Sequence, residues 1–169
     1  ALSTPSIQAL SIAGAAGGSF GEKSSATFMA AGAGARNEIH GEISARIDDA
    51  TVEADGRVSL LAYDYSDIVA VGIGAALGVT AGGGGAAMTV GLSFGRNEID
   101  NQVSAYIDAA SVTSAYGGIE LYVDQCAAIR ATAVAASVGA AGGTGFSLSL
   151  TGGGADAVNA ITTQANAYA

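Results

Sequence analysis

Hydrophobic and small or polar residues alternate with a period of two along several stretches of the chain. The alternation is clear in Val69–Ile73, Met88–Phe94 and Phe146–Leu150. Because successive side chains of a β-strand point to opposite faces, this period predicts strands. We expect each strand to span roughly 6–10 residues. The glycine-rich runs Gly82–Gly85 and Gly142–Gly145 lie between alternating stretches, where we expect a hairpin or a corner.

The alanine-rich stretches raise helix as a competing interpretation, since alanine has the highest helix propensity. Their glycine density, their β-branched residues and the lack of charged pairs four residues apart favour strands instead. Residues 127–136 are the stretch where helix competes most strongly. We therefore predict an all-β fold.

The composition indicates a thin structure. Half of the 169 residues are hydrophobic, but there is no Trp, only 4 Phe and 6 Tyr, and 26 residues are Gly. Small side chains fill little volume, so they suit layers whose backbones approach closely, with glycine where another backbone passes. We expect a flat or narrow molecule without a wide core.

Comparison of the sequence with itself reveals an internal repeat. Arg36-Asn37-Glu38-Ile39 recurs sixty positions later as Arg96-Asn97-Glu98-Ile99, and one residue is inserted near Tyr116. A degenerate third copy begins near Asn159. We interpret residues 1–169 as a single repetitive β domain of about two and a half units, namely 1–35 (partial), 36–95, 96–157 and 158–169 (partial).

Stacking such units would place equivalent residues above one another and form ladders of like side chains. We expect an elongated β-solenoid or β-helix with about 60 residues per unit, with stacked antiparallel hairpins as the alternative. The predicted ladder residues are Asn37, Asn97 and Asn159, with Ile39, Ile99 and Ile161 two residues further along the same face. A buried asparagine ladder would specify the register. The other interpretation makes Asn37 and Asn97 exposed turn residues.

The charge balance excludes one class of partner. Fifteen Asp and Glu oppose six Lys and Arg, giving a formal net charge of −9. Nucleic-acid binding requires a basic surface that neutralises phosphates, so we predict no nucleic-acid partner. No uninterrupted run of about 18 apolar residues is present, so we predict no transmembrane segment. Residues 1–5 lack a basic region, so we expect no signal peptide within this sequence.

Residues that could carry chemistry do not assemble into a recognisable catalytic motif. His40 is unmatched, since Asp100 takes its place in the next copy, and we expect it in a surface turn. Cys126 aligns with Tyr65 and is expected to pack as a small apolar group. We predict that the protein is not an enzyme.

The carboxylates recur with the repeat, which favours structural roles at corners and on strand surfaces over a unique active site. The recurring carboxylates are Glu38 with Glu98 and Asp48 with Asp108. Arg36 and Arg96 lie two positions before Glu38 and Glu98, so we expect surface ion pairs on one strand face. We predict no cofactor. Calcium is kept as an alternative because the carboxylates of Asp48, Asp49, Glu53 and Asp55 offer oxygen ligands. The single stretch Gly152–Asp156 also resembles the glycine-rich calcium-binding nonapeptide, without its full spacing.

The composition and period of two equivalent segments resemble a known class of protein. The segments are Ala50–Leu61 and its partner Ala110–Leu121, each followed by glycine- and alanine-rich stretches. They are similar to the repetitive β-solenoid regions of giant bacterial surface and secreted proteins, namely filamentous-haemagglutinin-like adhesins and autotransporter passengers. The resemblance covers nearly the whole chain, although the repeat is longer than one coil of that family. It implies an extracellular or cell-surface protein that serves as stalk, adhesin or matrix component.

These observations favour a structural or adhesive segment, a stalk or self-assembling filament unit formed by end-to-end strand stacking. Its partner would be itself, or the neighbouring repeats of a longer chain. The alternative is a module that binds glycans or surfaces, because glycan recognition uses exposed aromatic side chains. The candidate aromatic residues are Tyr63, Tyr65, Tyr106, Tyr122 and Tyr168.

Overall fold

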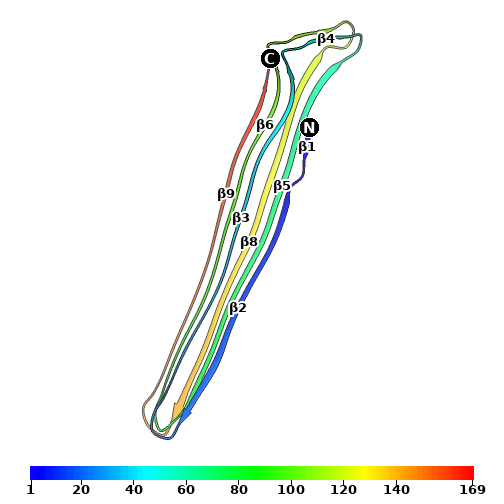
Figure 1. The fold of residues 1–169 in the computed structure, drawn as a ribbon. Coiled ribbons are helices and arrows are strands. Elements are labelled where there is room, and N and C mark those ends of the chain that lie inside the picture. Colours follow the sequence, from blue (N-terminus) through cyan, green and yellow to red (C-terminus); the bar gives the residue numbers. More distant parts are fainter.

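The computed structural model describes residues 1–169 and is all-β, with no helix. Long strands run almost the full length of an elongated molecule, and both termini lie near the same end (Figure 1). The strands that run away from that end are β2 (Ser6–Gly21), β5 (Val58–Gly82) and β8 (Ile119–Gly143), with the short β1 (Leu2–Ser3) before β2. The returning strands are β3 (Ser25–Asp48), β6 (Gly85–Asp108) and β9 (Ser147–Tyr168).

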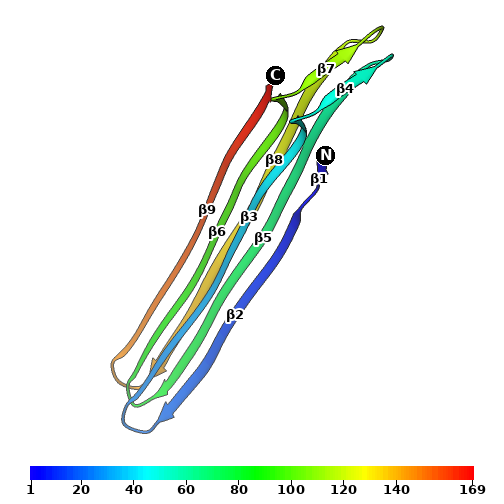
Figure 2. The ribbon, with the colours of Figure 1, turned by 45° about the horizontal axis from the view of Figure 1, so that its top comes forward.

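We call the end near the termini the proximal end and the opposite end the distal end. Two short strands, β4 (Thr51–Ala54) and β7 (Ser111–Ser114), pair with each other at the proximal end (Figure 2). At the distal end the chain turns from β2 into β3, from β5 into β6, and from β8 into β9 (Figure 2). The chain therefore runs back and forth between two long sheets.

Every strand pair is parallel, and paired residues lie 60 to 62 positions apart in the sequence. The first sheet contains β5 with β1 and β2 along one edge and β8 along the other, and the second sheet has the order β3-β6-β9. Ile7 pairs with Ile68 and Ile68 with Ile129. The stacked-hairpin alternative is wrong, because the successive strands β5 and β6 belong to different sheets. Gly82–Gly85 is a corner between them.

The strands are much longer than expected, with 24 or 25 residues in each of β3, β5, β6 and β8. The prediction of 6–10 residues was wrong because glycine and polar residues do not interrupt these strands. In a parallel stack each backbone N–H and C=O can bond to the neighbouring strand whatever the side chain. Of 100 backbone hydrogen bonds, 89 lie within the strands. Residues 127–136, where helix competed, lie inside β8.

The interior between the two sheets changes in character along the molecule. Near the proximal end it holds branched apolar side chains from both sheets, with Ile39, Ile68 and Ile99 in one cluster. A second cluster contains Ile43, Ala62 and Val103. All six side chains are at least nine-tenths buried. Burial of this kind stabilises by roughly 1.5–3 kcal/mol per large side chain, so this part supplies the hydrophobic core.

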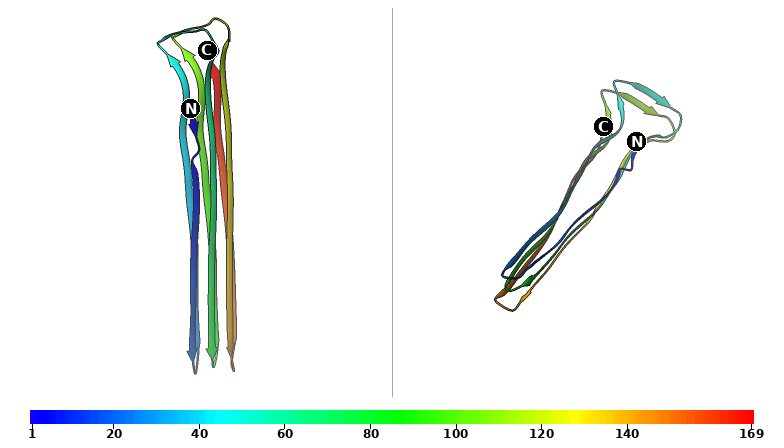
Figure 3. Two further views of the ribbon diagram at one scale, coloured as in Figure 1. Left: turned by 90° about the vertical axis from the view of Figure 1, so that its right-hand side faces the viewer. Right: turned by 60° about the horizontal axis from the view of Figure 1, so that its bottom comes forward.

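Towards the distal end the interior consists mainly of glycine, alanine, serine and threonine, and the two sheets come together closely (Figure 3, right). A Cβ at Gly74 would overlap the backbone carbonyl oxygen of Leu92 in the facing sheet. A Cβ at Gly78 would lie 2.6 Å from Thr89 Cγ2. Glycine thus occupies positions where another backbone or side chain leaves no room for a side chain, as the composition predicted.

Strand continuity decides which side chains face inward in this distal part. Ile68 points into the core, and the following even-numbered residues of β5 up to Thr80 are also buried. They are all small, whereas the odd-numbered residues, including Val71, Ile73 and Leu77, face outward. Because side chains alternate strictly along an unbroken strand, the proximal core fixes this arrangement. Large apolar residues therefore lie on the outer surface.

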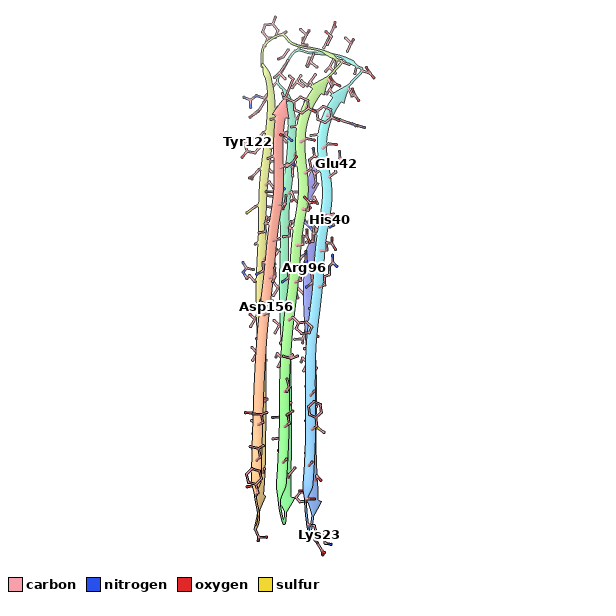
Figure 4. The ribbon with its side chains drawn as sticks, turned by 90° about the vertical axis from the view of Figure 1, so that its left-hand side faces the viewer. Lys23, His40, Glu42, Arg96, Tyr122 and Asp156 are labelled. Carbon is pink, nitrogen blue, oxygen red and sulfur yellow. The ribbon has the colours of Figure 1, made fainter.

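The two halves of the molecule also differ in charge. We define the distal half as residues 8–34, 69–95 and 131–155. Its only charged residues are Glu22 and Lys23, which balance each other, so the net charge of −9 lies entirely in the remaining residues. Figure 4 shows Lys23 at the distal tip, with His40, Glu42, Arg96 and Asp156 further towards the proximal end.

Candidate assembly site: the asparagine ladder and the sheet edges

The three asparagines predicted as a ladder lie side by side in the middle of β3, β6 and β9. Asn37 Nδ2 donates a hydrogen bond to Asn97 Oδ1 at 2.7 Å, and Asn97 Nδ2 donates to Asn159 Oδ1 at 2.8 Å. Asn97 is only 1% exposed. The interpretation of Asn37 and Asn97 as exposed turn residues is wrong, because both occupy strand positions and face inward.

The ladder has a direction. Each amide donates towards the next strand in the same sense, so Asn37 Oδ1 and Asn159 Nδ2 have no side-chain partner. One end of the ladder therefore offers an acceptor and the other a donor. Joining the two ends would satisfy both groups, since an amide can donate and accept at once.

The predicted isoleucine ladder lies two residues further along the same face. Ile39 pairs with Ile99, and Ile99 with Ile161. Ile39 and Ile99 are buried against Ile68 of the facing sheet, whereas Ile161 is 48% exposed because β9 is the last strand of its sheet. The apolar ladder thus ends on an open side.

The strands at both sides of the stack have one unpaired edge. In the left view of Figure 3, β2 and β3 lie at one side and β8 and β9 at the other. β2 and β8 each pair only with β5, and β3 and β9 each pair only with β6. Such rows of unpaired N–H and C=O groups readily accept a further strand.

A buried polar cluster, not expected from the sequence, joins the two sheets near the proximal core. The carboxylate of Asp64, which is fully buried, accepts hydrogen bonds from Ser66 Oγ at 2.9 Å and from Asn101 Nδ2 at 2.7 Å. Asp64 pairs with Ser3 on one side and Gln125 on the other, so the negative charge is not repeated in neighbouring strands. This avoids stacking like charges at the spacing of strands.

The surface of the second sheet carries the predicted ion pairs. Arg36 lies 3.3 Å from Glu38, and Arg96 lies 3.7 Å from Glu98. His40 also contacts Glu38 and lies 3.6 Å from Asp100. Its prediction as a turn residue was wrong: it lies within β3, where the continuous strand leaves no turn. The hydrogen bond with Glu38 raises the pKa of His40 and lowers the pKa of Glu38.

We expect an NMR titration of the His40 ring to give a pKa above its ordinary value of about 6.5. Glu38→Gln should bring that pKa back towards the ordinary value, because the Glu38 hydrogen bond is the main cause of the shift. Because the protonated His40 ring is favoured in the folded state, its contact with Glu38 stabilises the fold fully below about pH 6.5. This contribution to stability is lost as the pH rises through the pKa of His40 in the folded protein. Asp100→Asn is the control and should lower the pKa less. Equal effects of the two variants would contradict this assignment.

Three of the candidate tyrosines gather on the outer face of the first sheet. The rings of Tyr63 and Tyr65 are stacked with centroids 6.4 Å apart, and Tyr122 lies 5.8 Å from Tyr63. The hydroxyl of Tyr65 donates to Asp124 at 3.0 Å, which raises the pKa of Tyr65. Tyr106 and Tyr168 stack separately at 5.2 Å on the second sheet.

Cys126 does not pack as an apolar group, contrary to expectation. It pairs with Tyr65 in the next strand and, like Tyr65, is exposed. The alignment with Tyr65 was correct, and the outward direction of that position explains the exposure.

Asp48 and Asp108 each end a long strand at the proximal corner, and the residues after them, Asp49 and Ala109, adopt φ values of 47° and 46°. Nowhere do three or more His, Cys, Asp or Glu side chains gather closely enough to hold a metal ion. The structure has no helix with the length and hydrophobicity needed to span a bilayer.

Comparisons of this chain with protein-family models, with curated proteins and with solved structures find no match. The resemblance to filamentous-haemagglutinin-like and autotransporter proteins therefore rests on the sequence texture alone.

Proposed function

We propose that this chain is a segment of a β-solenoid with about 60 residues per turn, and that it serves as an extracellular structural or adhesive unit. Turns of one chain, or of successive chains, would stack end to end by strand pairing into a stalk or filament. The observation that carries the proposal is the directional asparagine ladder, which ends in an unpaired acceptor on one side and an unpaired donor on the other. The open edges of both sheets support it.

The internal register specifies the seam between two copies. β9 of one copy would pair with β3 of the next, with Asn159 opposite Asn37 and Ile161 opposite Ile39, because both sets share a row with β6. β8 would pair with β2 in the same way, with Ile129 opposite Ile7. Such a seam continues both ladders without a change of register.

The charges also tolerate this seam. The only charged residue of β9 is Asp156, which would lie opposite Gly34. Tyr168 would lie opposite Arg46, a pairing like the internal contact in which Arg46 donates to the Tyr106 hydroxyl at 3.2 Å. No charge of β9 meets a like charge, so the net charge of −9 does not oppose contact at this seam directly.

Asn159→Asp tests the seam. The aspartate keeps the Oδ1 acceptor that Asn97 uses within the chain, but it removes the outward donor and places a carboxylate against Asn37 Oδ1 of the next copy. We expect electron microscopy of the wild-type protein to show filaments of constant cross-section. Sedimentation of the wild-type protein should increase with its concentration. The variant should fold normally and require at least about tenfold more protein to assemble, because an unpaired buried charge is costly.

Asn166→Asp is the matched control. It makes the same amide-to-carboxylate change on the same strand, but it would face Ser44, which can donate a hydrogen bond. The control should assemble like the wild type. Wild-type protein that remains monomeric at millimolar concentration would refute self-assembly, and an unaffected Asn159→Asp variant would refute this register.

A glycan-binding module is the second candidate, and the cluster of Tyr63, Tyr65 and Tyr122 favours it. Aromatic faces beside a carboxylate, here Asp124, can stack on sugar rings and accept hydrogen bonds from their hydroxyl groups. Binding of wild-type protein on a glycan array, lost in Tyr65→Ala, would support this candidate, while filament formation supports the first.

A further inference from the structure

We propose that the outer face of the first sheet, in the distal half, binds the same face of a second copy of this chain, with the two copies antiparallel. The face is formed by the outward side chains of Leu10–Phe20 in β2, Val71–Ala81 in β5 and Thr132–Gly142 in β8. Thr132 is its only polar side chain. This contact is separate from the strand-edge seam, because it uses side chains on a sheet face.

The face is strongly apolar and uncovered. Leu10 and Ile12 are each 67% exposed, and Val138 is 59% exposed. These side chains cannot point into the molecule, because side chains alternate along the strand and Ile68 and the small residues that follow it occupy the inward positions. A contiguous apolar surface of this kind marks an interaction site.

The surface shape of this face is self-complementary, because a groove and a ridge lie side by side on it. The row Gly14, Ala75 and Ala136 forms the floor of a shallow groove of about 480 Å³ that crosses all three strands. The adjacent row Ile12, Ile73 and Val134 forms a ridge beside it. A two-fold axis between the two rows would place the ridge of each copy in the groove of the other. Such isologous contacts are the usual basis of dimers.

The charge distribution selects the antiparallel orientation. Side by side in the same direction, two copies would place their charged proximal halves, each with a net charge of −9, against each other. In the antiparallel arrangement only the distal halves overlap, and the proximal halves lie at opposite ends. The Asp67–Arg130 ion pair, at 3.4 Å, marks the border of the apolar face.

The size of the face predicts a weak contact. Leu10–Phe20 extends over roughly 35–40 Å, and three strands are roughly 14 Å wide, so both copies together bury on the order of 1,000 Å². Stable interfaces bury about 1,200–2,000 Å². Each further turn in a longer stack would widen the face by about 4.8 Å, so longer stacks should associate more tightly.

The outer face of the second sheet is the less suitable partner surface. Its distal half also carries large exposed side chains, but four outward glycines separate them, and Asp156 lies beside Phe94 at the proximal border of that half. The large side chains include Phe28, Met88, Leu92, Leu148 and Leu150. A carboxylate buried in a sheet-to-sheet contact would be costly. This difference provides a matched control for the experiment.

Ile73→Lys tests the proposal, and Met88→Lys places the same charge on the central strand of the opposite face, somewhat nearer the distal end. Both are made in the Asn159→Asp background to suppress end-to-end stacking. By sedimentation equilibrium the background protein should form a reversible dimer. Ile73→Lys should raise the dissociation constant at least about tenfold, because a buried unpaired ammonium is costly, whereas Met88→Lys should change it less than about twofold.

Cys126 provides a readout of orientation, since it is the only cysteine and is exposed. Spin labels on Cys126 should lie about 60 Å apart in the antiparallel dimer, from the strand rise of about 3.3 Å per residue on each side of the axis. A parallel dimer would bring the labels within about 15 Å, since facing sheets pack about 10 Å apart.

Equal weakening by Ile73→Lys and Met88→Lys, or a short distance between the labels, would overturn the proposal. So would protein that stays monomeric at millimolar concentration. If such monomeric protein floats with neutral phosphatidylcholine vesicles, and Ile73→Lys abolishes flotation, the face binds lipid and the self-association is wrong. The end-to-end stacking of the proposed function is distinguished by its dependence on Asn159, because Asn159→Asp should weaken filament formation and leave this face-to-face dimer unchanged.

Discussion

Gly74→Val is expected to lower the free energy of unfolding by more than about 3 kcal/mol, the upper end of the usual cost of overpacking. A Cβ at Gly74 would overlap the backbone carbonyl of Leu92 in the facing sheet, and a backbone group cannot rotate away as a side chain can. The two sheets would have to move apart and would lose contacts on either side of the site. Thermal unfolding followed by circular dichroism measures the loss, at about 2–4 °C per kcal/mol for a chain of this size.

Gly32→Val is the matched control for this substitution. Gly32 lies in β3, points outward, and has no atom within 4 Å of the position its Cβ would take. The control should be neutral or slightly stabilising, because valine favours strands over glycine. If Gly74→Val and Gly32→Val unfold at the same temperature, the sheets are not packed backbone against backbone at Gly74.

Asn101→Leu is expected to lower the free energy of unfolding by about 2–3 kcal/mol, the range for hydrogen bonds to a charged group. Asn101 Nδ2 donates to Asp64 Oδ2 and to Ser66 Oγ, both at 2.7 Å, and all three residues are buried. Leucine has a similar volume but no donor, so the Asp64 carboxylate would keep only the bonds from Ser66. Chemical denaturation monitored by tyrosine fluorescence measures the difference.

Gln102→Leu serves as the control for Asn101→Leu. Gln102 is the next residue of β6, but it points outward and is exposed. The same amide-to-leucine class of change should therefore alter stability by less than about 0.5 kcal/mol. Unaltered stability of Asn101→Leu would mean that Asp64 does not depend on this amide.

The repeat in the sequence was the most informative feature for the fold. It paired Asn37 with Asn97 and Tyr65 with Cys126, and the structure has these pairs in register. A parallel stack makes this inference dependable, because each residue then lies beside its own equivalent. Self-comparison of the sequence thus gives the strand pairing directly.

Strand length and the facing of the two sheets could not be predicted in the same way. Polar stretches such as Tyr63–Asp67 resemble loops when read alone, and only the neighbouring strands keep them extended. The contact of Asp64 with Asn101 joins residues of two different sheets, which no repeat relates. That contact depends on how the corners place one sheet over the other.

The outward apolar face was visible in the sequence only in part. Val71, Ile73 and Leu77 alternate with glycine and alanine, and large residues ordinarily mark the inner face of a strand. Here Ile68 faces inward, and Val58–Gly82 is one unbroken strand, so the odd-numbered residues that follow Ile68 must face outward. The usual assignment of large residues to the inner face is therefore inverted. Counting odd and even positions from Ile68 along one continuous strand would have revealed the outward apolar face.

Strand length also determines what such a stack can build. In the proposed solenoid, a turn of about sixty residues would raise the stack by only about 4.8 Å, while strands of about 24 residues make it roughly 80 Å broad. A thousand residues would thus reach a height of only about 80 Å. This geometry provides breadth in place of reach, so a stalk or filament of the proposed kind would gain length only by adding many turns or many copies of the chain.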